Sequence, residues 1–239
     1  MSKKDRKGTS LRQLIFRFRT GPQRRFRMRN ATRRRLKSTA QFIAVTGSSG
    51  KSTTVGLLAH ILQVHAPTKR QMLNNTLNEL IRTLKHLQPN VGFIVAELGV
   101  GGKGQMEPMA NMLQPNAAIV TMVGTEHYSA FRGREGVAEE KGALLDALAP
   151  DGFALLNADD PMVMDMALRS RARIVTFGKD NVAADYHAKD IHAAFPDMLS
   201  FTLVGRGQRL KLKAPFPGEH FWMPVAAAAA AALELGVPT

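Results

Sequence analysis

The chain of 239 residues contains no cysteine, which excludes disulfide bonds, thiolate catalysis and a cysteine-ligated zinc site. It also lacks a long apolar run, because the longest, residues 225–233, is mostly alanine and too short to span a bilayer. No apolar segment of sufficient length for a secretory signal follows the positive residues near the N-terminus. These absences fit a protein of the reducing cytoplasm.

Acidic residues are nearly absent from the first 39 positions, which hold 15 Lys or Arg and a single acid, Asp5. From chain totals of 33 basic and 19 acidic residues, the remainder therefore has 18 of each and is neutral. We predict that residues 1–40 form a basic arm outside a domain of residues 41–239. The arm is either a disordered, solvated tail or a segment that binds nucleic acid or an anionic membrane, which would hold the protein at the membrane periphery.

From residue 41 onward, short apolar runs alternate with segments of helical periodicity. This pattern predicts an α/β fold with a mostly parallel sheet covered by helices on both faces. After residue 180 the pattern changes to short strands with tight turns, which predicts a small antiparallel sheet near the C-terminus. The predicted strands are residues 41–45, 91–96, 117–123, 153–156, 173–177, 186–193, 198–204 and 209–213, and the predicted helices are residues 51–64, 76–87, 136–148, 161–168 and 225–235.

The stretch "VTGSSGKSTT", residues 45–54, joins the first predicted strand to the first predicted helix. A glycine-rich turn at a helix N-terminus presents backbone N–H groups to an anion and leaves room for phosphate oxygens. Lys51 is placed to reach the β- and γ-phosphates, and Ser52 to ligate Mg²⁺. Valine stands at position 45, where the usual phosphate-loop pattern has its first glycine. The predicted ATP-binding residues are Thr46, Gly47, Ser48, Ser49, Gly50, Lys51, Ser52 and Thr53.

The form T-G-x-x-G-K-[ST]-T resembles the nucleotide loop of the Mur ligase family, ATP-dependent ligases that act in peptidoglycan biosynthesis, with folylpolyglutamate synthase as a relative. The resemblance covers about residues 41–237 and corresponds to the family's central, ATP-binding domain. The segment "AIVTMVGTEHYSAFRGREGVAEEKGALLDAL" is most similar to the D-alanyl-D-alanine-adding branch of the family.

The resemblance implies roles for residues outside the loop. Glu97 ends an apolar strand, and an acid at the carboxyl end of a parallel strand lies on the ligand side of the sheet, where the family holds Mg²⁺. His127 stands at the place of a ligand for a second Mg²⁺. Lys141, in a "KG" pair, implies a lysine that is carbamylated by CO₂ and then ligates metal. Without the family, His127 would be a loop residue and Lys141 a solvated helix residue.

Three asparagines extend the candidate site. Asn157, in "ALLNADDP", would face the nucleotide, and the nearby Asp160 also fits the N-cap of a helix. Asn75 and Asn78, in "LNNTLNEL", would face the substrate, although turn and N-cap roles fit them equally.

The segment "PGEHFWMPVAAAA" is similar to the start of a family helix near the adenine. His220 matches the family pattern, whereas Phe221 and Pro224 replace two asparagines, one of which contacts adenine in the family. Adenine would then be recognised by stacking on Phe221 or Trp222.

The resemblance implies a ligase that joins a small-molecule carboxylate to an amine, using ATP and Mg²⁺. The carboxylate attacks the γ-phosphate to give an acyl phosphate, and the amine then displaces phosphate to form an amide. Lys51, Glu97 and Lys141 would carry this chemistry, with Ser52, Glu97, His127 and carbamylated Lys141 as metal ligands.

The family's flanking domains, which hold a uridine nucleotide in several members and close over ATP, have no counterpart in this sequence. We therefore expect no UDP-linked substrate. The closing domain belongs to a longer product, or comes from a partner chain, or the chain only binds nucleotide. The alternative function is a P-loop nucleotide-binding or ATPase module whose basic arm binds nucleic acid or an anionic membrane.

Overall fold

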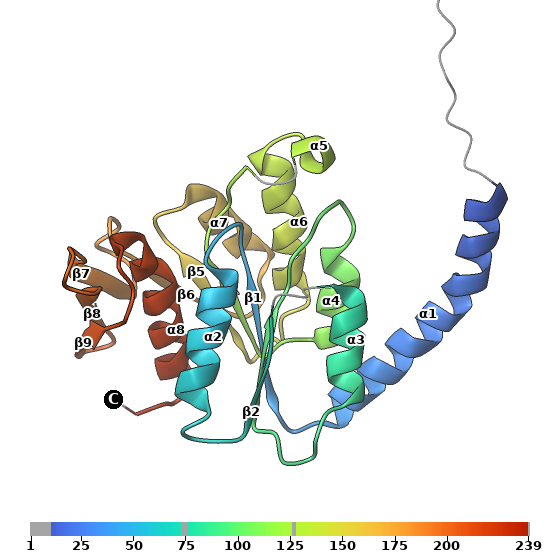
Figure 1. Ribbon diagram of the computed structural model, residues 1–239, viewed down its shortest axis with the longest axis horizontal. Coiled ribbons are helices and arrows are strands. Elements are labelled where there is room, and N and C mark those ends of the chain that lie inside the picture. Colours follow the sequence, from blue (N-terminus) through green and yellow to red (C-terminus); the bar gives the residue numbers. More distant parts are fainter. Residues whose placement is uncertain (1–10, 73–75, 126–127, 239) are drawn as a thin grey trace, which may run out of the picture.

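A computed structural model describes residues 11–72, 76–125 and 128–238 (Figure 1). In these residues nine strands form one sheet in the order β2-β3-β1-β4-β5-β6-β7-β8-β9. The neighbours from β2 to β7 pair in parallel, whereas β8 pairs antiparallel with both β7 and β9. The strands are β1 Gln41–Thr46, β2 Thr68–Gln71, β3 Phe93–Glu97, β4 Ala117–Val120, β5 Phe153–Asn157, β6 Arg173–Gly178, β7 Tyr186–His192, β8 Ser200–Gly205 and β9 Gln208–Lys213.

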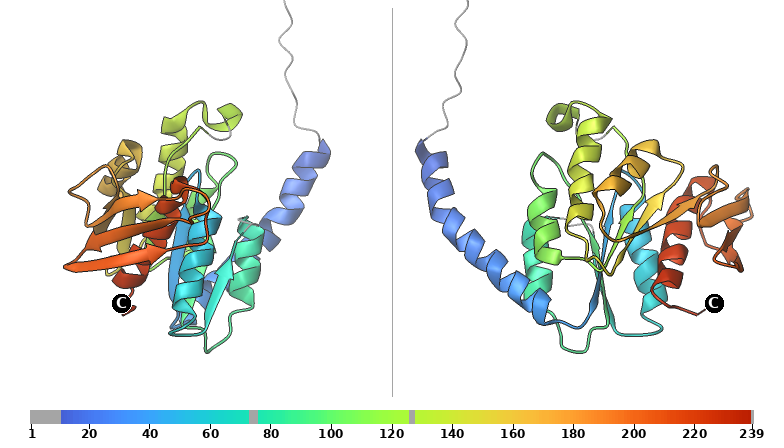
Figure 2. Two further views of the ribbon diagram at one scale, coloured as in Figure 1. Left: turned by 60° about the vertical axis from the view of Figure 1, so that its left-hand side comes forward. Right: turned by 180° about the vertical axis from the view of Figure 1, so that it is seen from behind.

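The predicted α/β class, with antiparallel strands near the C-terminus, is confirmed. The antiparallel strands continue the parallel sheet at one edge, as Figure 2 shows in orange. The helix predicted over residues 161–168 divides into an α-helix and a 3₁₀ turn, and the sequence patterns do not predict β2, α4 or α5. The helices are α1 Leu11–Lys37, α2 Lys51–Leu62, α3 Leu77–Lys85, α4 Met106–Leu113, α5 Tyr128–Phe131, α6 Arg134–Asp146, α7 Pro161–Asp165, η1 Met166–Arg169, η2 Glu219–Phe221 and α8 Trp222–Glu234.

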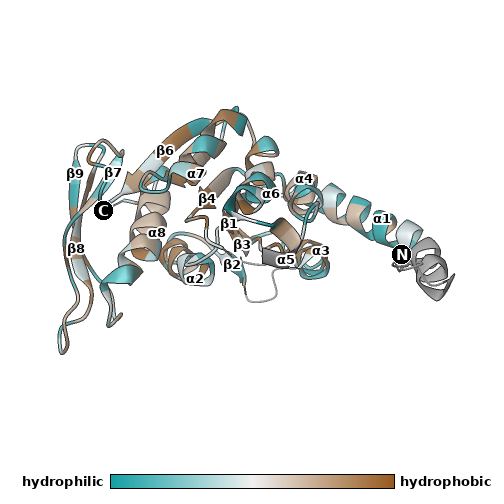
Figure 3. Ribbon diagram, turned by 90° about the horizontal axis from the view of Figure 1, so that it is seen from above, coloured by the Kyte–Doolittle hydropathy of each residue, from teal (hydrophilic) through white to brown (hydrophobic). Residues whose placement is uncertain are grey.

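Alternating side chains of the central strands fill two separate hydrophobic cores. In β1, Phe42 and Ala44 belong to one core and Ile43 and Val45 to the other, and all four are fully buried. The first face is covered by α3, α4, α6 and α7, and the second by α2 and α8 (Figure 3). Seven successive buried alanines, residues 226–232, let α8 approach its neighbours closely because they have no bulk beyond Cβ.

The basic N-terminal segment is helical, which corrects the expectation of a disordered tail for residues 21–37. Met28, Ala31 and Arg35 recur at helical spacing and turn toward α3 and α4, where Ala31 is 2% exposed. The N-terminal half of α1 extends away from the body (Figures 1 and 2). No helix in the described part of the chain has the length and apolar content needed to cross a membrane.

Arg35 fastens α1 to the body. Its Nε and Nη2 donate to the carbonyl oxygens of Leu113 and Gln114, each at 2.6 Å, and Nη2 also donates to Asn116 Oδ1 at 3.1 Å. The guanidinium lies over the Phe42 ring, 4.0 Å from the centroid. Burial lowers the pKa of this guanidinium from its ordinary value. These bonds also satisfy carbonyl groups at the end of α4.

Glu234 holds the end of α8 to the antiparallel strands. Its carboxylate accepts from Tyr186 Oη at 2.7 Å and Arg206 Nε at 3.2 Å, and it pairs with Arg173 Nη2 at 2.6 Å. Burial alone would raise the pKa of Glu234, but the hydrogen bonds from Tyr186 and Arg173 outweigh it and leave the pKa below its usual value. The carboxylate therefore stays ionised at neutral pH.

We expect Arg35→Gln to detach α1 while the sheet stays folded, because two carbonyl groups lose a charged donor. Loss of such bonds costs about 1.5–3 kcal/mol. The measurement is amide hydrogen exchange of residues 21–37 together with thermal unfolding. The matched control is Arg33→Gln, two residues away and exposed, which should change stability by less than about 0.5 kcal/mol. Equal exchange in both variants would contradict the role of Arg35.

Candidate active site

The predicted phosphate loop lies where the carboxyl ends of β3, β1 and β4 meet. β1 is flanked by β3 and β4 in the sheet, so the loop after β1 has the ends of both neighbours beside it. Gly47 and Gly50 have φ angles of 140° and 79°, values that side-chain-bearing residues rarely adopt. The first helical residue of α2 is Lys51, so its N-terminal N–H groups face the loop. The loop therefore has the predicted strand–loop–helix setting.

Gly47 is in close contact with Thr121, which directly follows β4. A Cβ atom at position 47 would lie 1.9 Å from Thr121 Oγ1. Thr121 Oγ1 donates to the carbonyl oxygen of Ser49 at 2.6 Å, and Ser48 N donates to Met122 O at 2.8 Å. The residues after β4 thus fix the loop conformation. Sequence reasoning missed Thr121, whose one signal is a hydroxyl at the end of an apolar run.

Two lysines from different elements converge on the loop. Lys51 Nζ donates to the carbonyl oxygen of Gly47 at 2.7 Å, and Lys141 Nζ donates to the same oxygen at 3.1 Å. Lys141 comes from α6 and is fully buried. Lys141 is therefore buried beside the phosphate loop, and a solvated helix position does not describe it.

Ser52 and Glu97 supply two adjacent oxygen donors. Ser52 Oγ donates to Glu97 Oε2 at 2.7 Å, and Glu97 is 3% exposed. Neighbouring ligands of octahedral Mg²⁺, at about 2.0–2.1 Å from the ion, are about 2.9 Å apart. The spacing and the oxygen donors therefore fit a Mg²⁺ ion. The predicted ligand His127 lies outside the described residues, in which no group of three or more His, Cys, Asp or Glu could hold a metal.

Glu140, the neighbour of Lys141, orders the glycine-rich segment after Glu97. It is 9% exposed and accepts three backbone N–H bonds at 2.7 Å, from Gly104, Gln105 and Met106. A carboxylate at the start of α4 is favourable because it complements the helix dipole. Sequence reasoning missed Glu140 because its partners are about 35 residues away.

The predicted asparagines differ in their surroundings. Asn157 is buried at the end of β5, where its Nδ2 donates to Thr121 O at 2.8 Å and its Oδ1 accepts from Asp159 N at 3.1 Å. Asn78 is exposed in the first turn of α3 and lines a groove between α1 and α3, and Asn75 lies outside the described residues. Thr53 is half-buried in the first turn of α2.

The aromatic residues at the start of α8 and just before it pack against neighbouring rings. Trp222 is 8% exposed and packs beside Phe177, at 6.4 Å between ring centroids. Phe221 stacks on Phe216 at 4.5 Å, and His220 is exposed. Trp222 therefore offers little accessible ring surface for stacking of adenine. The Phe221 ring is in contact with two rings, those of Phe216 and His220, the latter at 4.3 Å between centroids.

The fold and the loop define a P-loop domain of the α/β class. A profile of the Mur ligase middle domain matches residues 45–232, so the chain belongs to the Mur ligase family, as predicted. It is 32% identical over 198 residues to the UDP-N-acetylmuramoyl-tripeptide--D-alanyl-D-alanine ligase of Mycobacterium tuberculosis H37Rv, covering 81% of this chain and 38% of that protein.

Solved structures of the same branch have the same fold. The structure of MurF from Acinetobacter baumannii superposes with a TM-score of 0.83 at 29% identity, over 90% of this chain and 47% of that one. MurF ligase from Thermotoga maritima in complex with ADP has a TM-score of 0.81 at 19% identity, over 90% of this chain and 50% of that one. The chain thus spans half or less of the length of these relatives.

We expect Gly47→Ala to disrupt the loop, because the added Cβ would overlap Thr121 Oγ1 at an unfavourable φ. The expected loss of stability is about 2 kcal/mol or more, measured by chemical unfolding. The matched control is Gly56→Ala in α2, where an added Cβ meets nothing within 4 Å. That change should be neutral or stabilising by about 0.5–1 kcal/mol. Equal stability of the two variants would show that the Gly47 contact is not a constraint.

Proposed function

We propose that the chain is the ATP-binding part of a ligase that joins a carboxylate substrate to an amino acid or peptide through an acyl phosphate. The observation that carries this proposal is the convergence of Lys51, Lys141 and the Ser52–Glu97 pair on one phosphate loop. A plain ATPase loop needs Lys51 and Ser52 but has no use for a buried lysine from a distant helix.

The loop binds the triphosphate, and its residues align the γ-phosphate for attack. Backbone N–H groups of the loop, residues 46–53, hold phosphate oxygens, and Lys51 moves from the Gly47 carbonyl to the phosphate charge that develops during transfer. Ser52 and Glu97 would hold one Mg²⁺ ion, and His127 and carbamylated Lys141 would hold a second. The ions would supply charge neutralisation at the phosphates. Asn157 positions the residues after β4 on the nucleotide side of the sheet.

Lys141 acts as a carbamate. The Lys141 ammonium group first loses one proton to solvent. The neutral amine nitrogen then bonds to the carbon of CO₂ and releases a second proton, which leaves a carbamate anion with two oxygen donors. This change replaces one of the two cations beside the Gly47 carbonyl by an anion and so removes their mutual repulsion. The carbamate oxygens are ligands of the type that Mg²⁺ prefers.

The names of the relatives support a class of reaction for the chain. The related proteins are named for adding D-alanyl-D-alanine to a UDP-N-acetylmuramoyl-tripeptide. For this chain we propose a carboxylate substrate and an amine that is an amino acid or a peptide. We propose Asn75 and Asn78 as residues that face the substrate. We propose a partner chain as a source of a domain that closes over ATP and binds the amine.

A second candidate function is attachment through the basic N-terminal segment to nucleic acid or to an anionic membrane, which would make the protein peripheral to that membrane. This candidate is supported by the folded helix α1, which presents its cations at fixed spacing beside α3.

Lys51→Ala should weaken ATP binding about 10- to 100-fold, because a charge-assisted contact of about 1.5–3 kcal/mol is lost. Calorimetric titration with ATP, with and without Mg²⁺, measures this. Ser52→Ala should remove the part of the affinity that depends on Mg²⁺. Lys211→Ala, on the far edge of the sheet, is the charge-matched control and should bind ATP as the unchanged protein does. Unaltered affinity in Lys51→Ala would overturn the loop assignment.

Carbamylation of Lys141 is tested by ¹³C NMR after incubation with ¹³C-labelled bicarbonate. We expect a carbamate resonance in the unchanged protein and in the control Lys213→Gln, and its loss in Lys141→Gln. The spectrum reports the modification without any assay of activity. Identical spectra for the unchanged protein and Lys141→Gln would contradict the proposal.

A further inference from the structure

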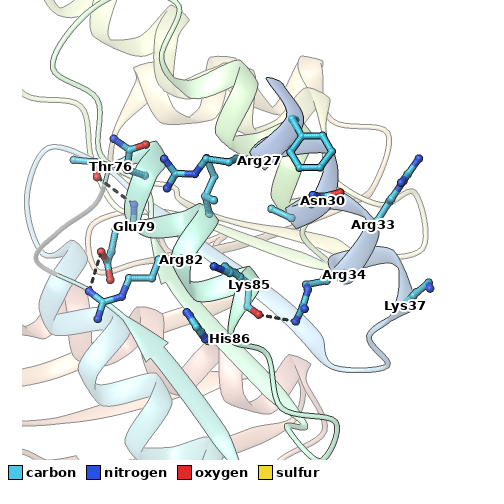
Figure 4. A pocket seen from close by; sticks show the side chains of 14 residues that line it. Arg27, Asn30, Arg33, Arg34, Lys37, Thr76, Glu79, Arg82, Lys85 and His86 are labelled. Carbon is cyan, nitrogen blue, oxygen red and sulfur yellow. Dashed lines mark hydrogen bonds and ion pairs between the residues drawn. The ribbon is translucent and has the colours of Figure 1, made fainter. Parts of the chain in front are cut away.

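A groove of about 980 Å³ lies between α1 and α3 (Figure 4). Its described lining is strongly cationic, because six lysines or arginines face a single acid, Glu79. Both walls contribute, so that an elongated ligand lying in the groove would meet positive charge on two sides. The basic residues are Arg27, Arg33, Arg34 and Lys37 from α1 and Arg82 and Lys85 from α3.

The positive charge continues past α3. A second depression of about 530 Å³ shares Glu79, Arg82 and His86 with the groove and adds Lys69 and Arg70 from β2. The two hollows therefore form one cationic band over α3, and we call the part between α1 and α3 the α1–α3 groove.

Most of these cations have no partner that neutralises them. In the part of the chain that the structure describes, Arg27, Arg33 and Lys37 make no side-chain hydrogen bond or ion pair. Arg82 approaches Glu79 at 3.8 Å, but its side chain is 73% exposed, so the pair contributes little. Such a cluster of like charges costs stability, and a bound polyanion would remove that cost.

We propose that the α1–α3 groove binds single-stranded nucleic acid through its phosphate backbone. The helix rises about 15 Å from Arg27 to Lys37, so a strand that lay along α1 would bring successive phosphates against several of its cations. Arginine forks match phosphate oxygens in two-point contacts. Phe26 lines the same groove and is 66% exposed, so its ring is available for base stacking.

The packing of α1 argues against a bilayer as the partner. A helix that lies in a membrane surface needs an apolar face turned outward. In residues 21–37 the apolar positions Met28 and Ala31 turn toward the protein body, while Phe26 and Leu36 are exposed singly. A flat bilayer would also meet only the rims of a groove, whereas a strand can lie inside it.

This proposal rests on the second candidate function, binding by the basic N-terminal segment, and is independent of the ligase proposal. The test compares three triple variants of the full chain in fluorescence anisotropy with labelled single-stranded RNA and DNA. The groove variant is Arg27→Gln, Arg33→Gln, Lys85→Gln. The arm variant, on α1 but outside the groove lining, is Arg24→Gln, Arg25→Gln, Arg29→Gln. The control, on β7 and β9 at the opposite edge, is Lys189→Gln, Lys211→Gln, Lys213→Gln.

We expect the groove variant to bind at least about tenfold more weakly, with a slope of log affinity against log salt that is smaller by about 2, since each phosphate contact contributes about 0.7. The control should match the unchanged protein. Phe26→Ala should weaken binding about fivefold or more and leave the salt slope unchanged. Comparison of the affinities for RNA and for DNA shows whether the 2′-hydroxyl group contributes to binding. Circular dichroism and ATP titration verify that each variant is folded.

Several outcomes would contradict the proposal that nucleic acid binds in the α1–α3 groove. If only the arm variant loses binding, the basic segment binds nucleic acid outside the groove. If the control variant loses as much affinity for nucleic acid as the groove variant, the loss reflects the lower net charge and not the groove. Binding to phosphatidylserine-containing vesicles, absent with phosphatidylcholine alone and with oligonucleotides, would assign the helix to membranes. No binding to any of these probes would remove the second candidate function as well.

Discussion

The carbonyl group of Gly47 is the point on which the candidate site depends. Its oxygen accepts hydrogen bonds from the ammonium groups of Lys51 and Lys141. Because Gly47 has no side chain, Thr121 can contact the loop. One backbone unit therefore links β1, α2, α6 and the end of β4. A glycine is required here for contact as well as for conformation, because any Cβ would enter the space of Thr121.

The two buried glutamates near this point have different tasks. Glu97 accepts a hydrogen bond from Ser52 of the loop. Glu140 instead accepts hydrogen bonds from three backbone N–H groups at the start of α4. Because Glu140 precedes Lys141 on α6, the segment after β3 and the lysine near the loop are positioned by the same helix. The site is thus a product of the packing of α4 and α6 on one face of the sheet.

The phosphate loop and most of the strands and helices could be predicted because they depend on local patterns: glycine positions, apolar runs and helical periodicity. Thr121 and Glu140 could not, because their roles come from partners about 35 to 72 residues away. The helix α1 could not be predicted from the sequence for another reason. Its charge pattern predicts a solvated tail, and only the tertiary contacts of Arg35 with Leu113 and Gln114 make it part of the fold. Strand β2, with the polar sequence TKRQ, lacks any apolar pattern.

The two outermost strands of the sheet share a property that bears on self-association. An open sheet has an unpaired backbone edge on each side, and such edges can pair with those of other molecules and lead to aggregation. Here both edges are positively charged, β2 through Lys69 and Arg70 and β9 through Arg209, Lys211 and Lys213. Two copies that approached edge to edge would repel one another at every combination of edges, which disfavours extension of the sheet at both ends.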